Sequence, residues 1–96
     1  MNATTPMQFR LYVAGDSENS MLARANLARL CEEHLPGNHV IEVIDVLTDP
    51  SRALAASVFV TPTLIKVVPT PVRRIIGNLS RKQAVADALG LDGVAA

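Results

Sequence analysis

The fold of this chain is decided by the stretch Thr61-Pro62-Thr63-Leu64-Ile65-Lys66-Val67-Val68, followed by Pro69-Thr70-Pro71 and then Val72-Arg73-Arg74-Ile75-Ile76-Gly77. Two runs rich in β-branched residues flank a rigid Pro-x-Pro turn, which is the local pattern of a β-hairpin. We therefore predict strands over residues 63–68 and 72–77, with Pro69 and Pro71 in the connecting turn.

Outward from this hairpin, apolar residues that alternate with polar ones predict strands, and apolar residues at helical spacing predict helices. Strands are expected over residues 8–14 and 40–46, a helix from Asp16 or Ser17 to about Leu35, and a short helix from Asp49-Pro50 to about Ser57. In the first strand, Phe9, Leu11 and Val13 share one face, while Arg10 and Tyr12 share the other. In the long helix, the residues expected to face the core are Ala23, Leu27, Leu30 and Cys31.

The last helix is predicted over residues 81–89. Ser80 and Gln83 have the spacing of a capping box, which places the start of the helix. Gly90 follows the last apolar residue of the pattern and supplies a C-terminal stop.

The order of elements is therefore βαβαββα, and it predicts an α/β fold. A strand, a crossover helix and another strand imply parallel, right-handed pairing of the first two strands. The hairpin adds two more strands, giving a four-stranded mixed sheet of order 2-1-3-4 with helices packed on it. This is the thioredoxin-like arrangement, in which Pro62 occupies the place of the cis-proline.

Composition indicates one domain over residues 1–96, with residues 1–6 and 91–96 expected to be flexible. Hydrophobic residues make up 49% of the chain and the mean hydropathy is +0.26, so the chain should fold. The formal net charge is zero, and we expect no nucleic-acid partner and no membrane partner. No apolar run has the length of a membrane span and no signal-peptide pattern occurs, so a cytoplasmic location is expected.

The fold class raises the possibility of thiol redox chemistry, and the residues argue against it. A reactive Cys-x-x-Cys belongs at the start of the first helix, where this chain has Asp16-Ser17-Glu18-Asn19. Cys31 is the only cysteine and is expected in the core. His34 and His39 lack a third clustered ligand, so we expect solvated loop histidines rather than a metal site. We expect no catalytic residue and no cofactor.

Several motifs together resemble the KaiB family of small clock proteins. The resemblance covers about residues 9–89 and is carried by Leu11-Tyr12-Val13-Ala14-Gly15, Asn19-Ser20, Val43-Ile44-Asp45-Val46, Asp49-Pro50, Thr61-Pro62-Thr63-Leu64, Pro71-Val72-Arg73-Arg74-Ile75-Ile76-Gly77 and Leu79-Ser80. The N-terminal sensor domain of the clock histidine kinase SasA is related. No kinase domain follows in this chain, so a stand-alone KaiB-like protein is expected.

The resemblance implies a non-enzymatic binding protein with two folds. One is a tetrameric ground-state fold with a rearranged second half, and the other is a monomeric thioredoxin-like fold. The second form would bind the ATPase KaiC and modulate its phosphorylation and ATPase cycle. KaiA and a sensor histidine kinase are further partners that the resemblance implies, as is self-association into dimers or tetramers.

One departure from the family pattern bears on which fold is preferred. Ala88-Leu89-Gly90 stands where the family usually has Gly-Leu-Asp. Alanine in place of glycine favours a helix by roughly 1 kcal/mol, and Gly90 falls at the helix end. With the β-branched runs over 63–68 and 72–77, this favours a mainly monomeric thioredoxin-like state. Pro62, Pro69, Pro71, Ala88 and Gly90 are thus the expected fold-determining positions.

The candidate partner-binding residues are basic side chains of the sheet, namely Arg10, Lys66, Arg73 and Arg74. Neighbouring strand residues point to opposite faces, so Arg73 and Arg74 cannot form one patch. One should reach over a sheet face and the other should point to solvent. The alternative is that these are simply solvated strand charges. The strand over 40–46 lies at a sheet edge and is a further candidate for partner pairing, with Glu42 and Asp45 discouraging self-pairing.

Three functions stay open from the sequence. The first is a KaiB-like protein that docks on a KaiC-type ATPase, in which Arg74→Ala would weaken binding with little effect on stability. The second is a KaiB-like signalling or stress-response module without a KaiC partner, distinguished by its gene neighbourhood. The third is a thiol oxidoreductase, which the missing second cysteine argues against.

Overall fold

The computed structural model describes residues 5–91 and contains the predicted hairpin. Strand β3 (Thr63–Val68) pairs antiparallel with β4 (Arg73–Ile76), with Thr63 opposite Ile76 and Lys66 opposite Arg73. The peptide bond before Pro62 is cis, as the fold class predicted, and the bonds before Pro69 and Pro71 are cis as well.

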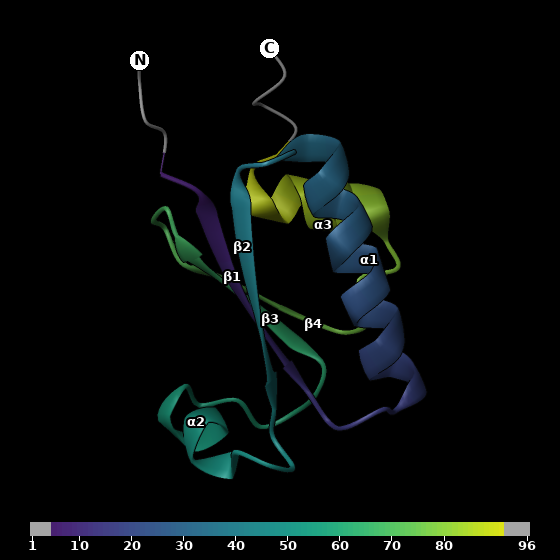
Figure 1. Ribbon diagram of the computed structural model, residues 1–96, viewed down its shortest axis with the longest axis vertical. Coiled ribbons are helices and arrows are strands. Elements are labelled where there is room, and N and C mark those ends of the chain that lie inside the picture. Colours follow the sequence, from purple (N-terminus) through teal and green to yellow (C-terminus); the bar gives the residue numbers. More distant parts are fainter. Residues whose placement is uncertain (1–4, 92–96) are drawn as a thin grey trace.

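The other strands extend this hairpin into a four-stranded mixed sheet. Strand β1 (Met7–Val13) pairs parallel with β2 (His39–Asp45) and antiparallel with β3, which gives the predicted order β2-β1-β3-β4. Three helices complete the βαβαββα order: α1 (Glu18–His34), α2 (Pro50–Ala55) and α3 (Lys82–Leu89). Figure 1 shows α1 and α3 together on one side of the sheet, away from α2.

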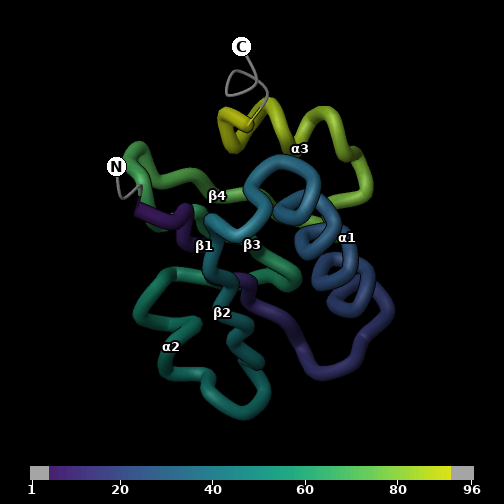
Figure 2. Tube along the Cα trace, turned by 45° about the horizontal axis from the view of Figure 1, so that its top comes forward, coloured from purple at the N-terminus to yellow at the C-terminus, as the bar shows by residue number. Residues whose placement is uncertain are grey.

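Two separate apolar clusters hold these layers together, one on each face of the sheet. The larger cluster joins Phe9, Leu11 and Val13 of β1 to the buried sides of α1 and α3. The smaller cluster contains Tyr12, Ile44, Ala53, Val58 and Ile65, and it holds α2 against the opposite face. The tube view in Figure 2 shows the same separation, with α2 apart from the α1 and α3 pair. The predicted alternation along β1 is confirmed.

The helix α1 is built as its sequence pattern predicted. Its N-cap is Ser17, whose Oγ accepts a hydrogen bond from the Ser20 backbone N–H at 3.3 Å. Its buried residues include the predicted Ala23, Leu27, Leu30 and Cys31. The helix ends before Pro36-Gly37, where the Leu35 N–H donates to the Cys31 carbonyl.

The start of α3 differs from the prediction, because no capping box forms. The N-cap is Arg81 and makes no side-chain cap bond. The Ser80 backbone N–H instead donates to Asn78 Oδ1 at 3.0 Å, and Gln83 Nε2 donates forward to Asp87 Oδ1 at 3.0 Å. A loop held by Asn78 therefore sets the entry into α3, and the Ser80/Gln83 prediction is wrong.

The end of α3 is closed by a Schellman motif centred on Gly90. Gly90 has a φ of +75°, and its N–H donates to the Asp87 carbonyl at 3.1 Å. The next N–H, of Leu91, donates to the Ala86 carbonyl at 2.9 Å, and the Leu91 side chain is only 1% exposed. Gly90 thus confirms the predicted C-cap. Leu91 corrects the expected flexible segment over 91–96, since it belongs to the core; residues 1–4 and 92–96 lie outside the described part.

Candidate protein-interaction surface

The register of the sheet sorts the four predicted basic residues into two pairs on opposite faces. Arg10 lies opposite Ile65, and Ile65 lies opposite Arg74, so both arginines lie on the face that α2 covers. Lys66 lies between Phe9 and Arg73 in the next row, on the face that α1 and α3 cover. The prediction that Arg73 and Arg74 do not form one patch agrees with this register.

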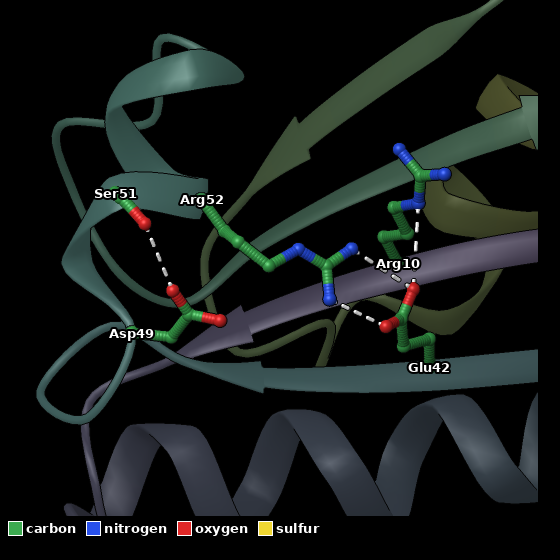
Figure 3. A network of polar contacts seen from close by, with 5 residues as sticks. All are labelled: Arg10, Glu42, Asp49, Ser51 and Arg52. Carbon is green, nitrogen blue, oxygen red and sulfur yellow. Dashed lines mark hydrogen bonds and ion pairs between the residues drawn. The ribbon is translucent and has the colours of Figure 1, made fainter.

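Arg10 belongs to an ion-pair network that ties α2 to the sheet (Figure 3). Glu42 of β2 lies opposite Arg10 and contacts its Nε at 3.5 Å. The same carboxylate accepts two hydrogen bonds from the Arg52 guanidinium of α2, one of them 3.1 Å from Nη2 to Oε1. The hydrogen bond from Arg52 is the main cause that holds the pKa of Glu42 below its ordinary value. This network fixes α2 over the sheet face.

Arg74 fixes the other end of α2. Its Nη1 donates to the Ser57 carbonyl at 2.9 Å and its Nη2 donates to the Ala56 carbonyl at 2.6 Å. These carbonyls lie at the C-terminus of α2, where backbone acceptors lack partners within the helix and a cation is favourable. Arg74 therefore reaches over a sheet face, as expected for one of the two arginines, and serves as a C-cap from a neighbouring strand.

Beside this anchored helix, apolar side chains stand exposed at one end of the molecule. We call them the α2 patch, and its members are Leu54, Phe59 and Val60, which are 69%, 79% and 50% exposed. A shallow hollow of about 350 Å³ lies among Leu54, Val58, Phe59 and neighbouring residues. Exposed apolar side chains that lie together mark interaction surfaces more often than scattered ones do.

The start of α1, where a redox centre would lie in a thioredoxin, carries two serines. The hydroxyls of Ser17 and Ser20 are 2.8 Å apart, and Ser20 Oγ also accepts a hydrogen bond from the Ala14 N–H at 3.0 Å. Their spacing is that of a Cys-x-x-Cys pair, one position later than the Asp16–Asn19 segment considered from the sequence. Neither hydroxyl has a neighbouring base among these hydrogen bonds, so they serve to hold the loop before α1.

The positions of Cys31, His34 and His39 argue for structural rather than chemical roles. Cys31 is fully buried, and burial raises its thiol pKa to about 12, which leaves it protonated and unreactive. His34 and His39 are not in a loop: His34 ends α1, and His39 opens β2 with its Nδ1 2.7 Å from the Leu35 carbonyl. Across residues 5–91, no group of three His, Cys, Asp or Glu residues is placed to hold a metal ion.

Strand β2 lies at one edge of the sheet, as predicted, and its Val40 and Val43 are exposed. Its acidic residues have partners within the chain. Glu42 binds two arginines, and Asp45 Oδ1 accepts hydrogen bonds from the N–H groups of Gly15 and Leu47, each at 3.0 Å. Asp45 therefore shapes the loops at the end of β1 and β2. The described helices include none that is long and apolar enough to cross a membrane.

The described residues thus combine a thioredoxin-like sheet with two serines at the start of α1 and an exposed apolar patch beside α2. The KaiB domain model matches residues 10–91, and the chain belongs to the KaiB family. The "Circadian clock protein KaiB3" of Synechocystis sp. is 48% identical over 86% of this chain and 79% of its own length. A "Circadian clock oscillator protein KaiB" of Prochlorococcus marinus is 45% identical over 96% of this chain and 84% of its own length.

Solved structures share the fold at low sequence identity. The N-terminal domain of Synechococcus elongatus SasA superposes with a TM-score of 0.73 at 18% identity, covering 93% of this chain and 88% of that domain. Chloroplastic thioredoxin z gives a TM-score of 0.72 at 20% identity, covering 92% of this chain and 80% of the thioredoxin chain. Both confirm the predicted fold class, and the curated relatives support a regulatory role in circadian timing.

Sequence reasoning missed two features of this surface. Arg52 was not singled out, because its partner Glu42 lies ten residues away on another element and no local pattern joins them. Phe59 was not singled out either. Its place in the Ser57-Val58-Phe59-Val60 segment, directly before Thr61-Pro62, was the signal available, since an apolar run in a connection without a strand pattern is unusual.

Proposed function

We propose that this chain is a non-enzymatic clock-type regulatory protein that binds a KaiC-like ATPase and modulates its phosphorylation and ATPase cycle. The observation that carries the proposal is the KaiB-domain match over residues 10–91, together with relatives named as circadian clock proteins. The proposal includes exchange with a tetrameric form, and KaiA or a sensor histidine kinase as further partners.

The α2 patch is the proposed docking surface for the ATPase. Large exposed apolar side chains become buried at the centre of an interface and contribute most of its affinity, and arginines are enriched around them. Arg74 borders the patch through its bonds to the end of α2, and Arg10 joins it through Glu42 and Arg52. We include both arginines in the proposed interface, and we assign Lys66 and Arg73 to a separate contact region on the opposite face.

The test is a titration of the full chain with the KaiC-type ATPase of the same organism. We expect Phe59→Ser to weaken binding by about tenfold or more, as a central apolar anchor should. The matched control is Met21→Ser, because Met21 is 56% exposed on α1, away from the α2 patch. Equal affinities for the two variants would place the interface elsewhere, and no binding by the wild type would favour a KaiB-like module with another partner.

A further inference from the structure

Lys66 is the one buried charged residue among residues 5–91, and its side chain has no partner there. Three polar or charged residues are buried: Ser20, Thr63 and Lys66, the last being only 5% exposed. Ser20 Oγ forms hydrogen bonds with the Ala14 N–H and with Ser17 Oγ, and Thr63 Oγ1 donates to the Val60 carbonyl at 2.6 Å. No hydrogen bond or ion pair engages the Lys66 ammonium within residues 5–91.

The position of Lys66 explains how its side chain is both buried and unpaired. Its direct neighbours across the sheet are Phe9, itself 1% exposed, and Arg73. Every fully buried side-chain nitrogen or oxygen of the described residues has a hydrogen-bond partner, so the unpaired Lys66 ammonium reaches solvent. The aliphatic stem is therefore packed in the sheet face while the charged tip opens at the surface.

A second cation, Arg73, lies opposite Lys66 on the same face of the sheet. Arg73 is opposite Lys66 in the antiparallel pair, and side chains at such positions have Cβ atoms about 5 Å apart on the same face. Like charges placed directly opposite each other are destabilising. No carboxylate of residues 5–91 forms an ion pair with either cation: Glu42 binds Arg10 and Arg52, Glu33 binds Lys82 at 2.8 Å, and Glu32 lies 3.9 Å from His39.

We propose that Lys66 and Arg73 form a binding site for a phosphate group carried by a small molecule. A phosphate monoester carries a charge of about −1.5 to −2 near neutral pH and offers three acceptor oxygens, which matches two adjacent cations. The planar guanidinium of Arg73 would bind two of the oxygens, and the Lys66 ammonium would supply a point charge. Packing of the lysine stem lowers the conformational entropy lost on binding. The site is independent of the ATPase surface proposed above.

The experiment is an NMR titration of the full chain with inorganic phosphate, at constant ionic strength balanced by chloride, with acetate in a parallel arm. We expect saturable amide shifts centred on residues 64–68 and 72–75 with phosphate, and weaker affinity for acetate. Arg73→Gln and Lys66→Met should each weaken phosphate binding by about tenfold, because each removes hydrogen bonds to a charged group. Arg24→Gln, on α1, is the control and should bind phosphate as the wild type does.

Three results would overturn the proposal: shifts that do not saturate, equal affinity for acetate and phosphate, or unchanged affinity in Arg73→Gln. Arg73 is exposed, so this variant should keep the fold even where Lys66→Met disturbs the packing beside Phe9. The titration contains no ATPase, so its outcome stands apart from that of the docking experiment.

Discussion

Neighbouring arginines of one strand have different surroundings, and this decides what each substitution does. Arg73 points to the face of α1 and α3 and has no partner among the described residues, whereas Arg74 bonds two carbonyls at the end of α2. The expectation that Arg74→Ala leaves stability nearly unchanged therefore no longer follows from the structure. An affinity loss in this variant would combine a lost contact with a loosened α2.

We predict that Arg74→Ala lowers the free energy of unfolding by about 0.5–1.5 kcal/mol, the usual net contribution of one hydrogen bond, because solvent around the exposed Arg74 weakens its charged bonds. Urea denaturation followed by circular dichroism measures it. Arg73→Ala serves as the control and should stay within about 0.5 kcal/mol of the wild type, as surface substitutions usually do. Equal stabilities for the two variants would mean that the Arg74 bonds to Ala56 and Ser57 contribute nothing.

Glu42 makes the stability depend on pH in the acid range. The hydrogen bond from Arg52, and then the nearby charges of Arg52 and Arg10, lower its pKa in the folded state from the ordinary 4.5. The folded state therefore binds this proton less readily than the unfolded chain does. The resulting stabilisation is fully present above pH 4.5 and is lost as the pH falls through the lowered folded-state pKa.

The prediction is that Glu42→Gln lowers the urea midpoint at neutral pH and reduces its decline on acidification. Below the folded-state pKa of Glu42, the variant and the wild type should have similar midpoints. Asp16→Asn is the control, because Asp16 is exposed and forms no ion pair within residues 5–91. Parallel pH curves for Glu42→Gln and the wild type would contradict this role.

The helices α1 and α3 begin by different means, although their starts look alike in sequence. Serine precedes α1 and α3 at similar distances, but only Ser17 caps its helix. At α3, the Asn78 side chain accepts the bond from the Ser80 N–H and donates to Asn19 Oδ1, while Asn26 of α1 donates to the Asn78 carbonyl at 2.9 Å. The entry into α3 is thus positioned by α1.

This difference predicts unequal effects for two identical changes. Ser17→Ala should destabilise the protein by about 1 kcal/mol, since it removes an N-cap and the contact with Ser20. Ser80→Ala should change stability by less than about 0.5 kcal/mol. Chemical denaturation of both variants under the same conditions is the measurement. A larger loss of stability in Ser80→Ala than in Ser17→Ala would contradict this prediction and favour a Ser80/Gln83 capping box.

On the scale of the whole molecule, the described state is the thioredoxin-like one, with both hairpin strands and α3 formed. Its C-terminal part is held by the Gly90 motif and by the Leu91 side chain in the larger cluster. Exposed Ala88 favours the helix as well. These features all belong to the second half of the chain, which the family resemblance implies is rearranged in the tetrameric state.

We predict a mainly monomeric wild type and a shift toward tetramer in the double variant Ala88→Gly with Gly90→Asp. The glycine costs the helix roughly 1 kcal/mol, and aspartate at a left-handed position weakens the C-cap further. Light scattering after size exclusion gives the oligomeric state, and secondary chemical shifts over residues 63–77 give the fold. A tetrameric wild type with helical shifts there would contradict the prediction, as would a double variant that stays monomeric.

The sequence by itself determined the order of the elements, the hairpin, the buried stripe of α1 and the glycine stop of α3. Those features depend on periodicity and on turn chemistry within a few residues, and both are written in the local sequence. The family resemblance likewise came from short motifs, and the KaiB-domain match over residues 10–91 confirmed it.

Tertiary structure alone decided how the charged side chains are used. Arg74 reaches carbonyls 17 and 18 residues away, and Arg52 meets Glu42 only because α2 folds back over the sheet. The register of β3 against β1 and β4 sets Lys66 beside Phe9 and Arg73, and the packing of α3 draws Leu91 into the core. Such contacts depend on which distant segments become neighbours, and local propensity does not encode that.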